Sequence, residues 1–206
     1  PWVSAHLWLS DAHVCEWKGI VCNGENKIET INMERNNLSG SLPQEIAMIS
    51  STLLSLQMTD NSIYMEGSMF DVFGHLTMLT ELLFDDNYMY HEQGLPSQFK
   101  MMDRLLKLRL SYNLFSGELE TTNQVLASMP QLTHLEIESN YLTGTMPSVI
   151  GQLTNLVYIY MRRNEMKYNL DFLKGGKLTD LCKCPSEVSA ALLELCLFSN
   201  PFWSLI

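Results

Sequence analysis

A pattern of the form L-x-x-L-x-L-x-x-N-x-L recurs six times along this chain of 206 residues. Its best-preserved copy spans residues 132–142, and the Asn at its ninth position returns at intervals of 25, 26, 26, 27 and 24 residues. These residues are Asn36, Asn61, Asn87, Asn113, Asn140 and Asn164. A template with several fixed positions at one narrow period predicts a stack of similar coils, which is a solenoid.

Each fixed position of the pattern has a physical reason. The L-x-L core alternates with period two, which predicts a short strand whose apolar side chains face the inside of the coil. Stacked coils then pair these strands in parallel and form a concave sheet. The Asn lies where the chain leaves the strand, and its amide can both donate and accept hydrogen bonds. We therefore expect the six Asn residues to form a ladder that satisfies buried backbone groups.

The second half of the repeat predicts a bend and a short convex helix. Residues 36–43 and 140–147 share the motif N-x-L-[ST]-G-x-[LM]-P, in which Gly permits the bend and Pro favours a helical turn. The fourth copy has Glu120 in place of Pro. We expect extra residues at 91–94 and 120–124 to bulge from the convex or lateral side. The expected convex helices or 3-10 turns are residues 44–49, 70–75, 98–102, 125–129 and 148–152.

The predicted fold is a curved α/β solenoid with a parallel concave sheet and about six repeats of 24–27 residues. We expect one continuous domain, with an N-terminal cap at residues 1–27, repeats at 28–177 and a C-terminal cap and tail at 178–206. The first cap carries Trp2, Trp8 and Trp17, whose rings can cover the open end of the first coil.

The five cysteines lie only at the two ends of the chain, which favours disulfides in the caps and an oxidising compartment. Cys15 and Cys22 are expected to close a short loop, the alternative being two free buried thiols. At the other end, Cys196 can pair with Cys182 or with Cys184, leaving one thiol over.

Charge and composition exclude several classes of function. The formal net charge is −10, which disfavours nucleic acids and anionic membrane surfaces as partners. No apolar run reaches the roughly 18 residues of a membrane-spanning helix. The chain begins at Pro1, which we interpret as a processed chain or fragment, so any membrane anchor would belong to a segment outside it.

A search for chemistry favours a protein without catalysis, metal or cofactor. None of the five His has a second ligand at metal-binding spacing, apart from His13 near Cys15, and that cysteine is already assigned to the cap disulfide. The acidic pairs Asp85–Asp86 and Glu136/Glu138 are interpreted as solvated charges on an exposed sheet. No nucleophile elbow and no phosphate-binding Gly run is found in the sequence.

Two motifs together carry a family likeness. The segment from Cys15 to Cys22 has the form C-x-W-x-G-[IV]-x-C, and with the N-x-L-[ST]-G-x-[LM]-P repeats it resembles the plant-type extracellular leucine-rich repeat proteins. That family includes receptor-like ectodomains and polygalacturonase inhibitors, and similar proteins occur in diatoms and other algae. The resemblance implies a secreted or cell-surface solenoid, with a membrane-anchored form possible, that recognises a protein or peptide.

In such a fold the outward residues of the concave sheet form the surface that meets a partner. Tyr and Arg are enriched in binding hot spots, so we expect a ligand near six residues at the C-terminal end of the repeats. They are Arg109, Tyr112, Tyr158, Tyr160, Arg162 and Arg163. The alternative is that the charges pair across strands, Arg109 with Glu136 and Arg162 with Glu138.

Asn37 begins the sequon Asn37-Leu38-Ser39 and is expected to be exposed, so it is a candidate glycosylation site or an unused sequon.

The favoured function is non-catalytic recognition of a protein or peptide by the concave face. The alternatives are a structural subunit docked in a larger complex and an inhibitor of a wall-degrading hydrolase. A charged concave face would favour transient recognition over permanent docking.

Overall fold

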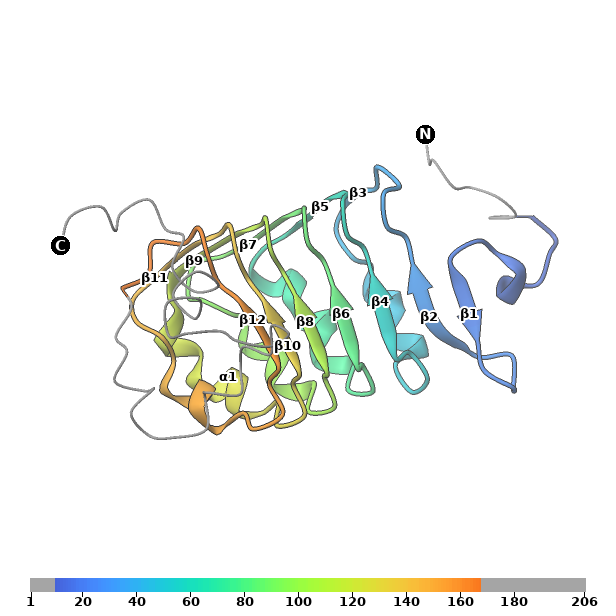
Figure 1. The fold of residues 1–206 in the computed structure, drawn as a ribbon. Coiled ribbons are helices and arrows are strands. Elements are labelled where there is room, and N and C mark those ends of the chain that lie inside the picture. Colours follow the sequence, from blue (N-terminus) through green and yellow to red (C-terminus); the bar gives the residue numbers. More distant parts are fainter. Residues whose placement is uncertain (1–9, 168–206) are drawn as a thin grey trace, which may run out of the picture.

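The computed structural model describes residues 10–167, and these form a curved solenoid of stacked coils (Figure 1). A seven-stranded sheet lines one face in the order β1-β2-β4-β6-β8-β10-β12. Its strands are β1 (Ile20–Cys22), β2 (Ile28–Asn32), β4 (Ser55–Gln57), β6 (Glu81–Leu83), β8 (Lys107–Arg109), β10 (His134–Glu136) and β12 (Tyr158–Tyr160). From β2 onward all neighbours are parallel, and equivalent repeat positions pair, for example Leu82 with Leu108. The predicted solenoid with a parallel sheet is therefore confirmed.

A second sheet, which the sequence analysis did not predict, lies along the side of the solenoid. Its five parallel strands follow the order β11-β9-β7-β5-β3. They are β3 (Ser39–Gly40), β5 (Ser62–Met65), β7 (Tyr88–His91), β9 (Leu114–Glu118) and β11 (Tyr141–Thr143). Side chains alternate between buried and outward, as in β5, where Ile63 is buried and Tyr64 is exposed.

Short helices return the chain on the convex side. They are η2 (Gln44–Ile49), η3 (Gly67–His75), η4 (Ser97–Met101), η5 (Leu119–Thr122), α1 (Asn123–Ala127) and η6 (Ser148–Gln152). The first and last match the predicted bounds, and the others differ by one to three residues at an end. The extra residues of the fourth repeat form most of η5 and the start of α1. The extra residues of the third repeat begin at His91, the last residue of β7.

The core runs through the coils without interruption. Leu56, Leu82, Leu108 and Leu135 occupy the same repeat position and are fully buried. Five phenylalanines of the described residues are fully buried in this core, and the rings of Phe73 and Phe99 meet edge to face with centroids 5.2 Å apart. Burial of such side chains contributes roughly 2–3 kcal/mol each, so the core supplies most of the stability.

The Asn residues of the repeat form a ladder between coils. Asn87 Oδ1 accepts a hydrogen bond from the Ile63 backbone N–H at 2.9 Å, and its Nδ2 donates to the Met58 carbonyl at 2.9 Å. Asn113, Asn140 and Asn164 each make the same two bonds to the preceding coil. These bonds satisfy the backbone where the chain passes from one sheet to the other.

The residue before each ladder Asn adopts a left-handed backbone conformation, with φ between 53° and 57°. This left-handed row consists of Arg35, Asp60, Asp86, Tyr112, Ser139 and Arg163. The conformation turns the chain sharply, and it aims two Arg, two Asp, one Tyr and one Ser side chain at the edge of the concave face.

The N-terminal cap is an antiparallel hairpin added to the sheet. Cys15 and Cys22 form a disulfide, which joins η1 (Val14–Glu16) to β1, and β1 pairs with β2. Gly19 has φ +87°, and a Cβ there would collide with the carbonyl oxygen of Asn32. Trp2, Trp8, Cys182, Cys184, Cys196 and the predicted C-terminal cap lie outside the described residues.

Candidate functional site

The concave surface is crossed by ion pairs that join neighbouring coils. Lys107 Nζ lies 2.7 Å from Glu81 Oε1, and Arg162 Nε lies 3.2 Å from Glu138 Oε2. Arg109 lies between two carboxylates, 2.8 Å from Asp85 and 3.3 Å from Glu136. The pairs Arg109–Glu136 and Arg162–Glu138 are those that the sequence suggested as an alternative to ligand binding. They hold the side chains of several coils in fixed positions.

The interpretation of Asp85 as a solvated charge is wrong. Its side chain is 7% exposed, and Oδ1 accepts a hydrogen bond from the Ser111 backbone N–H at 2.9 Å. Burial raises the pKa of Asp85 to about 6, and the Arg109 guanidinium opposes that shift. Arg109 and Asp85 form an ion pair without hydrogen-bond alignment. Glu136 is also half-buried, and burial raises its pKa. Of these acidic residues, Asp86 is exposed, as expected.

The predicted ligand residues fall into two groups. Arg109 and Arg162 are engaged with carboxylates of adjacent coils. Tyr112, Tyr158 and Arg163 are exposed, and Arg163 donates a hydrogen bond of 3.1 Å to the Tyr112 hydroxyl across the intervening coil. Tyr160 lies beside Tyr158 on β12 and is part-buried. The structure therefore places aromatic rings and one exposed guanidinium at the C-terminal end of the concave face.

His134 also belongs to this surface, although it is not among the six ligand residues predicted from the sequence. Its ring stacks on Tyr158 with centroids 4.5 Å apart and planes 28° apart. Burial, together with nearby Lys107 and Arg109, lowers the pKa of His134, which favours the neutral ring. The register could have shown this contact, because residues 134 and 158 hold the same repeat position in adjacent coils. We define the terminal patch as Tyr112, His134, Tyr158, Tyr160, Arg162 and Arg163.

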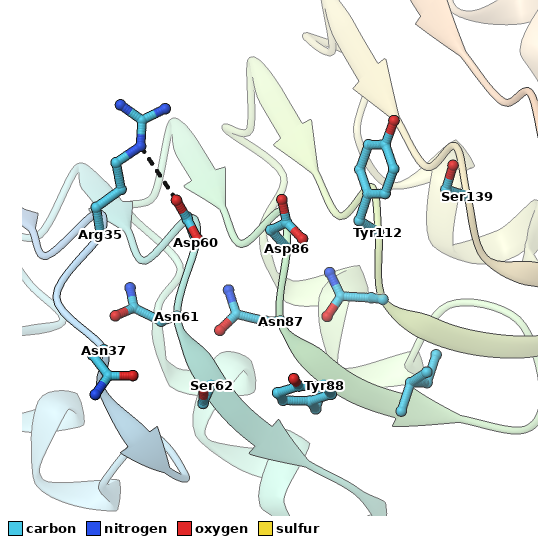
Figure 2. A pocket seen from close by; sticks show the side chains of 12 residues that line it. Arg35, Asn37, Asp60, Asn61, Ser62, Asp86, Asn87, Tyr88, Tyr112 and Ser139 are labelled. Atoms are coloured by element: carbon cyan, nitrogen blue, oxygen red, sulfur yellow. Dashed lines mark hydrogen bonds and ion pairs between the residues drawn. The ribbon is translucent and has the colours of Figure 1, made fainter.

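A lateral groove of about 660 Å³ runs where the chain passes between the two sheets (Figure 2). Figure 2 shows three rows of side chains along it. All residues of the left-handed row except Arg163 form one wall, the ladder residues Asn61, Asn87 and Asn113 form the floor, and the opposite wall includes Asn37, Ser62 and Tyr88. Arg35 spans two coils of the first wall and lies 3.3 Å from Asp60. The groove is lined mainly by residues of polar type and is open to solvent.

Among residues 10–167, no cluster of three or more His, Cys, Asp or Glu could hold a metal ion. The same part of the chain contains no helix with the length and apolarity needed to cross a bilayer.

The repeats match a known family. The leucine rich repeat model aligns with residues 27–48 and 131–153, which cover the first and fifth coils. The receptor protein-tyrosine kinase CEPR1 of Arabidopsis thaliana is 22% identical over 149 residues, which are 71% of this chain and 15% of that kinase. The chain therefore contains leucine-rich repeats and is similar to plant leucine-rich repeat receptor kinases.

Solved structures show the same fold for this leucine-rich repeat protein. The BIR2 ectodomain from Arabidopsis thaliana superposes with a TM-score of 0.67 at 18% identity, covering 80% of this chain and 85% of that one. The structure of PEPR1–AtPEP1 superposes with a TM-score of 0.56 at 23% identity, covering 74% and 24%. This leucine-rich repeat chain therefore spans a small part of its kinase relative and most of the BIR2 ectodomain.

Proposed function

We propose that this leucine-rich repeat protein recognises a protein or peptide partner through its concave face, at the cell surface or outside the cell, without catalysing a reaction. The observation that carries the proposal is the terminal patch, which combines exposed Tyr158 and Tyr112 with the exposed guanidinium of Arg163. Rigid aromatic rings and Arg are the side chains that most often anchor partners.

Preorganisation supports this function. The ion pairs and the His134–Tyr158 stack fix side chains before a partner arrives, so binding would cost little side-chain entropy. The concave face is also charged, which favours a partner that binds and leaves over a permanently docked subunit.

The relatives point in the same direction. CEPR1 is a receptor kinase, BIR2 was solved as an ectodomain, and PEPR1 was solved with AtPEP1. A location outside the cell also agrees with the Cys15–Cys22 disulfide, since such bonds persist in oxidising compartments.

Selection of binders from a displayed peptide library would test the proposal. We expect selected peptides to lose at least roughly tenfold in affinity on Tyr158→Ala or Arg163→Ala, and on the double change Tyr160→Ala with Arg162→Ala. Tyr141→Ala is the matched control, because Tyr141 is 55% exposed but lies on the second sheet.

Peptides that keep their affinity for all three terminal-patch variants would contradict this assignment. Folding of each variant is checked by circular dichroism, so that loss of structure is not read as loss of binding.

A further inference from the structure

We propose that Asn37 carries an N-linked glycan whose first sugars lie in the lateral groove and stack on Tyr88, so that the protein's own carbohydrate occupies this groove. The inference rests on the extracellular location proposed above, because a sequon is modified only in the secretory pathway. The groove adjoins the concave face proposed to bind the partner, and Tyr112 is the one terminal-patch residue that also lines it.

The attachment site is accessible. Asn37 is exposed, and no hydrogen bond of its side chain occurs among the described residues. Its backbone is left-handed, with φ 52°, and Ser39, the third residue of the sequon, is exposed at the start of β3. The side-chain amide is therefore free to carry a sugar, whereas the neighbouring Asn36 is buried in the ladder.

The attachment site also lies inside the groove and not beside it. Asn37, Ser62 and Tyr88 hold the same repeat position in three successive coils and form one wall (Figure 2). Ser62 is small, so the wall between Asn37 and Tyr88 is low. A glycan that leaves Asn37 along the coils would pass over Ser62 and meet the ring of Tyr88.

The lining suits a carbohydrate. A sugar ring has an apolar C–H face and a rim of hydroxyl groups, so it needs an aromatic ring on one side and polar groups around it. Tyr88 is 53% exposed and pairs in register with Tyr64, which is 39% exposed. Asp60 and Asp86 on the opposite wall offer carboxylate acceptors for hydroxyl and N-acetyl N–H donors. The groove volume is within the range that holds ligands of a few rings.

Tyrosine labelling in the secreted protein would test the inference. The full chain is secreted from a eukaryotic host, and intact mass with and without N-glycosidase shows whether Asn37 is occupied. Tyrosine iodination is then followed residue by residue by mass spectrometry. We expect Tyr88 to react at least about fivefold more slowly in the glycosylated protein than in Ser39→Ala, which lacks the sequon.

Two controls separate the glycan from the mutation. Ser39→Thr keeps the sequon and should protect Tyr88 like the original chain, and enzymatic removal of the glycan should restore reactivity without any substitution in the gene. Tyr141 is the internal reference, since its 55% exposure nearly equals that of Tyr88 and it lies outside the groove. Its reactivity should not change.

A glycan on Asn37 that leaves Tyr88 as reactive as in Ser39→Ala would overturn the inference, and so would a secreted chain with bare Asn37. Neither result touches the recognition proposed for the concave face. A chain that no host secretes would instead count against the extracellular function and, with it, against the glycan.

Discussion

The buried carboxylate of Asp85 makes the stability of the fold depend on pH. Its folded-state pKa of about 6 lies above the ordinary 3.8, so between these values the folded chain binds more protons than the unfolded chain. The free energy of unfolding contributed by this group is therefore highest below pH 4 and falls as pH rises toward 6. Full ionisation of Asp85 lowers the free energy of unfolding by about 3 kcal/mol, and relaxation of the structure around the charge reduces this cost.

Asp85→Asn should remove this dependence. An amide keeps an acceptor for the Ser111 N–H and carries no charge to desolvate. We expect the variant to be more stable than the original chain by about 1–3 kcal/mol at pH 7.5, and by much less at pH 4.5. Urea unfolding at both pH values measures the free energy of unfolding of the variant and of the original chain. Asp86→Asn is the control, because Asp86 is an exposed neighbour, and it should leave the free energy of unfolding nearly unchanged at both pH values. An equal effect of Asp85→Asn at both pH values would refute the assignment.

Asp85 also marks a limit of prediction from sequence at the residue scale. The ladder Asn residues and the buried leucines followed from the repeat, because their positions relative to the strand are fixed by period. Asp85 holds a position that alternation assigns to the surface. Whether such a residue is buried depends on side chains and backbone of the next coil, here Arg109 and Ser111. The repeat pattern does not predict these contacts.

Among the elements, the N-terminal hairpin depends on one backbone position. Asn32 N–H donates to the Gly19 carbonyl at 2.7 Å, and this close approach leaves no room for a Cβ on Gly19. The disulfide holds the same hairpin from its other side. Together they allow β1 to cover the edge of β2 that the first coil would otherwise expose.

Gly19→Ala should therefore destabilise the cap. We expect a loss of about 2–4 kcal/mol from the left-handed backbone and the collision with Asn32. Gly24→Ala is the control, because a Cβ there meets nothing within 4 Å, and it should be close to neutral. Chemical denaturation gives both values. Similar stability of the two variants would show that the hairpin can adapt to a Cβ at position 19 without loss of stability.

The second sheet shows what sequence patterns leave out at this scale. The motif N-x-L-[ST]-G-x-[LM]-P was interpreted as a bend, yet its residues form β3, β9 and β11, and β5 and β7 occupy the same part of coils that lack the motif. Gly and Ser disfavour strands locally, and the pairing becomes visible only when coils are stacked. The terminal patch has the same origin, since the contact between Tyr112 and Arg163 joins residues 51 apart.

Over the whole molecule, burial at one repeat position varies along the solenoid. Leu82 and Leu108 in the middle are fully buried, Ile159 in the last described coil is 8% exposed, and Ile31 in the first is partly buried. Coils pack mainly against their neighbours, so a coil with less buried surface should open before the others.

Hydrogen exchange should reveal this gradient. We expect amides of β6 and β8 to exchange at least roughly tenfold more slowly than those of β2 and β12, a difference of about 1.4 kcal/mol in opening free energy. Measurement by mass spectrometry on peptides from each strand is sufficient. Equal protection of all four strands would mean that the described coils unfold as one unit.

Residues of the left-handed row can change without any change in the interior of the fold. Six side chains in one backbone conformation are each held by a different coil, and none belongs to the core. Exchanging one of them alters the edge of the concave face without repacking the core. Descendants of this gene could therefore keep an identical interior and still present different chemistry to their surroundings, one coil at a time.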